Sequence, residues 1–151
     1  MRAIIFEGLD GSGKTTLFRE FEARNNHYYA CFDRFPPISS YVYDRFYSRF
    51  QEDYPRRWWM DSMLLQLRRR GIVIIHVDTD PLTCFERRDN DDFTINDLTR
   101  QWELYEDVMG LVRKWNIPVM RVNGDRDPSW NVTLINQWIF QKGVKEFING
   151  L

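Results

Sequence analysis

One segment close to the N-terminus constrains the architecture more than any other part of the chain. It reads Gly8-Leu9-Asp10-Gly11-Ser12-Gly13-Lys14-Thr15 and matches the pattern G-x-x-x-x-G-K-[ST] in full. The segment follows a short apolar run and opens a helical pattern. Glycines let successive backbone N–H groups turn inward around phosphate oxygens, and the helix N-terminus adds the positive end of its dipole. The sequence therefore predicts a phosphate-binding loop, the P-loop, made by Gly8, Asp10, Gly11, Ser12, Gly13, Lys14, Thr15 and Thr16.

Two side chains of this loop have defined expected roles. Lys14 bridges the β and γ oxygens of a bound nucleoside triphosphate, and the Thr15 hydroxyl is a ligand for Mg²⁺. The match in both motif and context disfavours an ordinary glycine turn before a helix. The loop alone still predicts only nucleotide binding, because switches, ATPases and kinases all contain it.

Strand-like and helical patterns alternate along the rest of the chain. The expected strands cover residues 3–7, 28–33, 72–77 and 118–122. The expected helices cover residues 14–24, 57–70 and 132–148, and two more begin near residues 81 and 94. We interpret the second strand as buried. This alternation implies a parallel sheet joined by right-handed crossovers. We predict an α/β fold, a P-loop NTPase-type three-layer α/β/α domain over residues 1–151, with about four strands and helices on both faces.

Short signals mark the ends of several helices. Asp80 is suited to cap a helix that starts at Pro81. Thr94 and Asp97 form a capping-box-like start to a long helix, and Gly71 ends the helix before the third strand. The apolar face of the long helix is expected to comprise Ile95, Leu98, Trp102, Tyr105, Met109 and Val112.

The composition limits the class of protein. The chain has 151 residues, of which 43% are hydrophobic, enough for one packed core. Its 21 basic and 22 acidic residues give a net charge of −1, which disfavours long duplex nucleic acid but allows small charged ligands. Cys31 and Cys84 indicate no disulfide framework or zinc site, so we interpret them as reduced core thiols. The start lacks a signal-peptide pattern and the apolar runs are strand-sized, so we expect a cytoplasmic protein with no membrane partner.

Three segments carry a resemblance to a known family. They are the P-loop with its flanks, Phe6 to Thr16; Asp33-Arg34-Phe35 followed by Ser39-Ser40 and Tyr43; and Val77-Asp78-Thr79-Asp80-Pro81 leading into Glu86-Arg87-Arg88. Together they resemble a shortened member of the thymidylate kinase-like family of P-loop nucleoside and nucleotide kinases. The resemblance spans residues 4–45 and 72–109, more than half of the chain.

The resemblance implies roles for individual residues. Asp33 would lie near Mg²⁺ and the phosphates of ATP, and Arg34 would contact the acceptor phosphate. Asp10 would face the acceptor sugar hydroxyl, while Arg87 and Arg88 would close over the phosphates from a lid at about residues 85–96. The implied catalytic set is Lys14, Asp33, Arg34, Arg87 and Arg88, with Thr15 and Asp33 as metal ligands.

The resemblance also implies where the adenine of ATP and the nucleobase of the acceptor lie. Residues 123–127 follow the last strand, where related kinases hold adenine. Members of the family place an aromatic side chain and an arginine against the acceptor base. The candidates for these two positions are Tyr41, Phe46, Arg49 and Phe50.

Simpler interpretations stay open for several of these residues. Asp33 and Arg34 are suited to form a structural ion pair, and Arg87 or Arg88 to be surface charges. Ser39 and Ser40 are suited to cap a helix. The residues expected to be structural or half-core are Trp58, Trp59, Trp102, Trp115, His27 and His76.

The chain departs from the family in one respect. No strand and no Arg-Glu-Pro-Gly-like segment lie between the first helix and Asp33. Deoxynucleoside kinases carry in that segment a glutamate that deprotonates the acceptor hydroxyl, whereas a monophosphate acceptor is already ionised and needs no base. The gap therefore favours a small-molecule acceptor, a deoxynucleoside monophosphate of the thymidylate type. Asp33 as a base is an alternative, which keeps open a kinase of a hydroxyl, on a deoxynucleoside or on a modified base or end in DNA.

Two further alternatives concern activity and assembly. A regulatory module that binds nucleotide without transferring phosphate is disfavoured by the intact Lys14 and Thr15. A homodimer stays open, because the family's members are often dimers.

Overall fold

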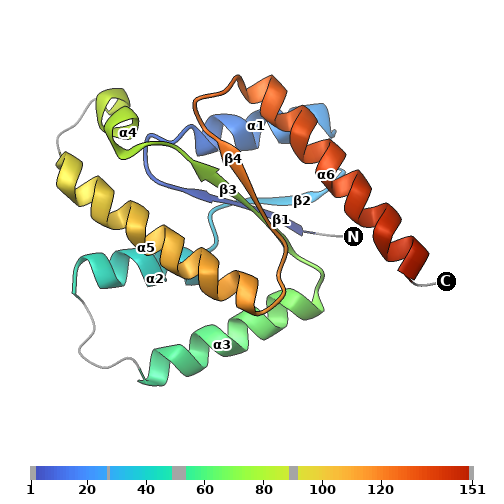
Figure 1. Ribbon diagram of the computed structural model, residues 1–151, viewed down its shortest axis with the longest axis horizontal. Coiled ribbons are helices and arrows are strands. Elements are labelled where there is room, and N and C mark those ends of the chain that lie inside the picture. The colour runs from blue at the N-terminus through green and yellow to red at the C-terminus, as the bar shows by residue number, and fades with distance from the viewer. Residues whose placement is uncertain (1–2, 27, 49–53, 89–91, 150–151) are drawn as a thin grey trace.

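The fold is a four-stranded parallel sheet between two layers of helices, seen in a computed structural model that describes residues 3–26, 28–48, 54–88 and 92–149. The strands are β1 (Ala3–Gly8), β2 (Ala30–Asp33), β3 (Val73–Asp78) and β4 (Val119–Asn123). The helices are α1 (Lys14–Arg24), α2 (Pro36–Phe46), α3 (Tyr54–Arg69), α4 (Pro81–Arg87), α5 (Ile95–Lys114) and α6 (Pro128–Asn149). The sheet order is β2-β1-β3-β4, and all pairs are parallel (Figure 1). The predicted fold class is confirmed.

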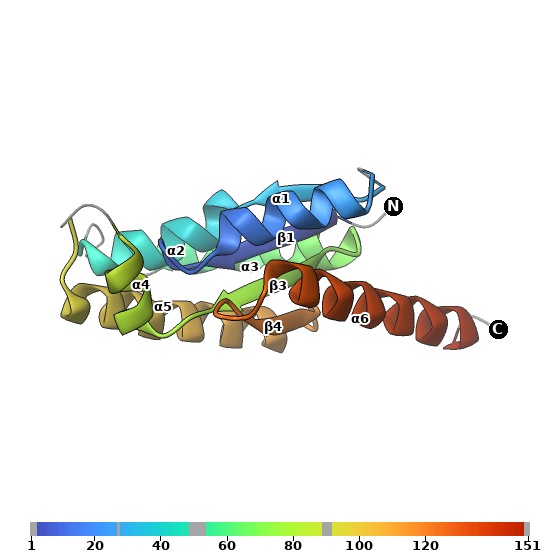
Figure 2. The ribbon, with the colours of Figure 1, turned by 90° about the horizontal axis from the view of Figure 1, so that it is seen from above.

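Each face of the sheet has its own apolar core. Helices α1 and α6 cover one face, while α2, α3 and α5 cover the other (Figure 1, Figure 2). Within β1, Ile5 joins the core under α2, α3 and α5, whereas Ile4 and Phe6 join the core under α1 and α6. Successive side chains of a strand point to opposite faces, so a central strand is apolar on both.

The prediction that the second strand is buried is wrong. Strand β2 pairs only with β1 and forms an edge of the sheet, and the Phe32 side chain on it is 49% exposed. The strand begins at Ala30, and Tyr28 before it is exposed. Among the described residues no strand pairs with the outer side of β2, which agrees with the segment that the sequence lacks at this point.

The predicted helix signals are confirmed, with two corrections. Asp80 accepts a hydrogen bond from the Leu82 N–H, and Thr94 and Asp97 form the full capping box of α5. Ile95 is 40% exposed and does not belong to the apolar face, because it stands in the first turn, ahead of the packed part of α5. Ser39 caps no helix, since α2 already begins at Pro36.

Two further expectations can be compared with the structure: that the cysteine thiols are reduced and that no segment spans a membrane. Both cysteines are free, Cys84 buried and Cys31 half-buried on the edge strand, and burial raises the pKa of each thiol to about 11. In the described part of the chain no helix has the length and apolarity needed to span a bilayer.

Candidate active site

The P-loop joins β1 to α1 in the conformation that its glycines allow. Gly11 and Gly13 have φ angles of 80° and 87°, a left-handed backbone that favours glycine. The loop is held from below by the Thr79 hydroxyl, which donates to the Ser12 carbonyl oxygen at 2.8 Å. A cavity of about 300 Å³ opens above it, and its lining includes Asp10, Lys14, Thr15, Arg34 and Arg87. These five are predicted site residues, and so are Gly11, Gly13 and Thr16, which line the same cavity.

Lys14, Thr15 and Asp33 form one polar cluster at the start of α1. The Asp33 carboxylate, at the end of β2, contacts the Lys14 ammonium through one oxygen and accepts a 3.0 Å hydrogen bond from Thr15 through the other. Lys14 is nearly buried, so this pairing neutralises it where no phosphate is present. Parallel pairing of β2 with β1 brings Asp33 beside the loop, since Phe6 and Asp33 are register partners.

The cluster supplies oxygen ligands that suit Mg²⁺. This ion usually binds through one or two carboxylates plus substrate phosphates and keeps several waters. A hydroxyl and a carboxylate from Thr15 and Asp33 fit that pattern. Among the described residues no three His, Cys, Asp or Glu side chains gather around one point, so the protein offers no complete metal cage there.

Two arginines converge on Asp10 in the P-loop. Arg34 pairs with one carboxylate oxygen, and Arg88 Nη1 lies 3.5 Å from the other. Arg34 also contacts the Tyr43 hydroxyl at 3.4 Å, and the Arg88 guanidinium lies 4.9 Å from the centre of the Phe93 ring. The interpretation of Asp33 and Arg34 as a mutual ion pair does not hold, because each points to a different partner.

Arg87 connects the P-loop to the segment after β4. Its guanidinium lies 3.3 Å from the Gly11 carbonyl oxygen and 3.0 Å from Asp125 Oδ1. A second cavity of about 380 Å³ lies here, lined by Gly13, Thr16, Leu17, Val77, Arg87, residues 124–128 and Asn131. The predicted adenine segment therefore borders a cavity beside the P-loop.

Glu7 is a site residue that the sequence analysis missed. It is fully buried and accepts hydrogen bonds from the Phe35 N–H at 2.6 Å, the Ser39 hydroxyl at 3.3 Å and the Tyr105 hydroxyl at 3.4 Å. Burial raises the pKa of Glu7 to about 7. A charged residue inside an otherwise apolar strand, one position before the P-loop, was the signal that could have revealed it.

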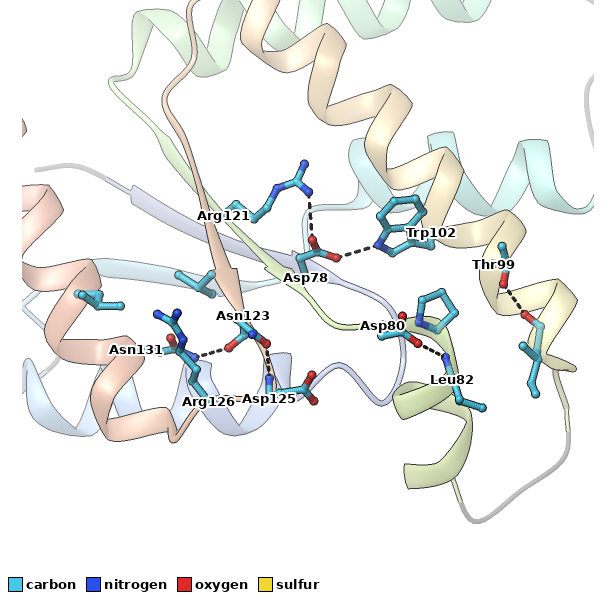
Figure 3. Close-up of a pocket in the computed structure, with 14 residues that line it drawn as sticks. Asp78, Asp80, Leu82, Thr99, Trp102, Arg121, Asn123, Asp125, Arg126 and Asn131 are labelled. Atoms are coloured by element: carbon cyan, nitrogen blue, oxygen red, sulfur yellow. Dashed lines mark hydrogen bonds and ion pairs between the residues drawn. The ribbon is translucent and has the colours of Figure 1, made fainter.

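A third and larger cavity, of about 770 Å³, lies on the outer side of β4 (Figure 3). Asp78 lies between Trp102 Nε1 at 2.8 Å and Arg121 Nη1 at 3.0 Å. Trp102 is half-buried, as expected. This cavity shares Asp125, Arg126 and Asn131 with the cavity beside the P-loop.

Other expected residues have structural surroundings or cannot be placed. The Arg45 guanidinium lies 3.5 Å from the centre of the Tyr41 ring, and Phe46 packs edge-on against Phe93. His76 is buried, and burial lowers its pKa to about 4. Trp115 is half-buried against the core. The expectations for His27, Arg49, Phe50 and the side chains of Trp58 and Trp59 lie outside the described residues, as does part of the predicted lid, residues 89–91.

The fold is that of P-loop kinases, as solved structures show. YorR protein from Bacillus subtilis, in complex with phosphorylated GDP, matches with a TM-score of 0.67 and 15% identity, over 93% of this chain and 97% of that chain. Deoxyadenosine kinase from M. mycoides with bound dATP matches with a TM-score of 0.64 and 14% identity, over 91% of this chain and 98% of that chain. No protein-family model and no curated protein sequence matches the chain. At this identity the likeness establishes the fold alone.

Proposed function

We propose that this chain is an ATP- and Mg²⁺-dependent phosphotransferase, with a deoxynucleoside monophosphate of the thymidylate type as its first candidate acceptor. The observation that carries the proposal is the arrangement of cations around the P-loop. Lys14 comes from α1, Arg34 from the turn after β2, and Arg87 and Arg88 from the end of α4. Phosphoryl transfer needs positioning and positive charge on the transferred group more than covalent chemistry.

The donor side is formed by the P-loop and the cavity beside it. Backbone N–H groups and Lys14 hold the β and γ phosphates, and Arg87 reaches over the loop from α4. Thr15 and Asp33 would hold Mg²⁺, which would offset the charge of the phosphates. The adenine lies in the 380 Å³ cavity against residues 124–127.

The acceptor side is formed around Asp10. Two guanidinium groups that share one carboxylate mark a point where a second anion is favoured, and an acceptor phosphate suits it. Asp10 pairs with the two arginines before the acceptor binds, and it faces the sugar of the acceptor afterwards. The nucleotides bound by YorR and by deoxyadenosine kinase support a nucleotide or nucleoside as the acceptor class.

A second candidate function is transfer to a hydroxyl, on a deoxynucleoside or on a modified base or end in DNA. Among the described residues no strand covers the outer edge of β2, where Phe32 is exposed, and this favours an acceptor larger than a free nucleotide. The candidate needs a base, and Asp33 is already engaged by Lys14 and Thr15. We therefore rank it second.

The test is a transfer assay with γ-labelled ATP and Mg²⁺. The acceptor panel contains deoxynucleoside monophosphates, deoxynucleosides and oligonucleotides with and without modified bases, and Lys14→Ala is the control protein. Label on a monophosphate supports the first candidate, and label only on a nucleoside or an oligonucleotide moves the assignment to the second. ATP binding with no label on any acceptor overturns both.

A further inference from the structure

Glu7 is a buried carboxyl group to which the proposed function gives no role. Its side chain is fully buried in the middle of the sheet, although it stands one residue before the P-loop. A group without exposed surface does not touch a ligand directly in this conformation. Glu7 therefore acts on the site through the groups that it binds and through its charge beside Arg34 and Lys14.

The carboxylate of Glu7 joins three elements. Its Oε1 accepts from the Phe35 N–H at 2.6 Å and from the Ser39 hydroxyl at 3.3 Å, so it holds the turn after β2 and the first turns of α2. Its Oε2 accepts from the Tyr105 hydroxyl of α5 at 3.4 Å. One side chain thus ties the Arg34 turn and α2 to α5, within one helix layer.

The turn that Glu7 holds is strained. Arg34 has a φ of 74°, a left-handed conformation that is unfavourable for a residue with a Cβ atom. Its own N–H donates to the Phe6 carbonyl oxygen at 2.9 Å, which continues the pairing of β2 with β1. The next N–H, of Phe35, has left the strand and goes to the Glu7 side chain instead. Residues 6 and 7 therefore fix the backbone on both sides of Arg34.

We propose that Glu7 is a positioning residue, whose carboxylate holds the left-handed turn at Arg34 and thereby aims the Arg34 guanidinium at the acceptor anion site beside Asp10. The proposal rests on the proposed function for the role of Arg34. Without this anchor the turn relaxes toward an ordinary backbone conformation, and the guanidinium moves away from Asp10 and Tyr43.

Ionisation of Glu7 supports this role. Burial raises its pKa to about 7, against the opposing effects of the Phe35 N–H, the Arg34 and Lys14 cations and the Ser39 hydroxyl. The titratable neighbours on the other elements are Tyr43, Tyr105, Asp10 in the P-loop, and His76 on β3. Burial raises the pKa values of both tyrosines and lowers the pKa of His76 to about 4. The tyrosines and His76 are therefore neutral near pH 7. The ionised carboxylate is the stronger acceptor for the Phe35 N–H, so Arg34 is held more firmly above pH 7 than below it.

The test compares the full chain with Glu7→Gln, which keeps the size of the side chain and removes its charge. Acceptor KM, kcat and the ATP dissociation constant are measured from about pH 6 to about pH 9, a range that brackets the titration. We expect kcat/KM for the acceptor to fall by about tenfold to a hundredfold, the scale of a displaced site group. ATP binding should change less than about twofold. The ratio of wild-type to Glu7→Gln acceptor kcat/KM should rise through pH 7, because the second ionisation of a phosphate acceptor, at about pH 6, is common to both proteins. Equal losses of ATP and acceptor binding, or a ratio that stays constant with pH, would overturn the proposal.

Ser39→Ala keeps the proposal testable if Glu7→Gln does not fold. The Ser39 hydroxyl lowers the pKa of Glu7. Its removal should therefore shift the pH dependence of kcat/KM for the acceptor to higher pH in a variant that still folds. An unshifted pH dependence in this variant would count against the positioning role. A wild-type chain that transfers no phosphate would instead refute the proposed function. The positioning role is then judged by the NMR signal of the Arg34 Nε–H, identified through Arg34→Lys and expected to move in Glu7→Gln. An Arg34 signal that does not move overturns the role independently of transfer.

Discussion

Thr15 Oγ1 lies 3.0 Å from Asp33 Oδ2, which brings a hydroxyl at the start of α1 against the carboxylate that ends β2. A hydroxyl and a carboxylate are oxygen ligands of the kind that Mg²⁺ takes from proteins, so under the proposed function this pair would hold the ion beside the P-loop.

Thr15→Val should raise the Mg²⁺ concentration for half-maximal transfer by about tenfold or more, because it removes one of the two proposed protein ligands. Thr15→Ser keeps the hydroxyl and is the matched control, expected near wild type. The measurement is a Mg²⁺ titration at saturating ATP. Equal Mg²⁺ dependence of Thr15→Val and Thr15→Ser would place the metal elsewhere.

Lys14→Ala should reduce transfer by at least about a hundredfold, the scale of a lost electrostatic contact to developing charge. The substitution also leaves Asp33 without its cation, so the melting temperature is recorded beside the rate. Near-normal turnover in a folded Lys14→Ala would mean that the P-loop does not hold the transferred phosphate.

Arg34→Ala should impair use of the acceptor much more than ATP binding, because its guanidinium contacts Asp10 and Tyr43 and does not line the 380 Å³ cavity proposed for the adenine. Steady-state kinetics for both substrates, with ATP binding measured separately, provide the check. Losses of equal size for ATP and acceptor would move Arg34 to the donor side.

Arg87→Ala and Arg88→Ala should impair the use of different substrates, although the two residues are adjacent in the sequence. Arg87 contacts Gly11 and Asp125, so its loss should raise KM for ATP, whereas Arg88 faces Asp10, so its loss should raise KM for the acceptor. Each variant is the control for the other. Indistinguishable effects would show that the two arginines do not divide between ATP and the acceptor.

Glu7 should make the stability of the protein depend on pH. Its pKa rises from 4.5 to about 7 on folding, so its stabilising contribution is fully present below pH 4.5 and is lost as the pH rises through 7. The difference is on the order of 3 kcal/mol. His76 acts in the opposite sense, since its pKa falls from 6.5 to about 4 and its contribution is lost as the pH falls through 4.

Denaturant unfolding of wild type and Glu7→Gln from about pH 5 to about pH 8 isolates the Glu7 contribution, because His76 is common to both proteins. The stability of wild type relative to Glu7→Gln should fall as the pH rises. A difference that stays constant over this range would show that Glu7 has an ordinary pKa.

How much of this could be read from the sequence depends on the range of each interaction. The bounds of α1, the Asp80 cap and the Thr94–Asp97 box were predicted correctly, because their hydrogen bonds close within a few residues. The strand assignments were right in number and approximate place. The burial of the second strand was predicted wrongly, because the same run of apolar residues is compatible with an edge strand and with a central strand.

The P-loop pattern and the alternation of strands and helices were sufficient to specify a phosphate cradle on a parallel α/β sheet, because backbone conformation and period are local properties. The partners of the charged groups were not accessible in the same way. Glu7 meets the Phe35 N–H across 28 positions and Tyr105 across 98, and Arg34 meets Asp10 across 24. Which carboxylate receives which donor follows from strand order and helix packing, so only the folded chain assigns those pairs.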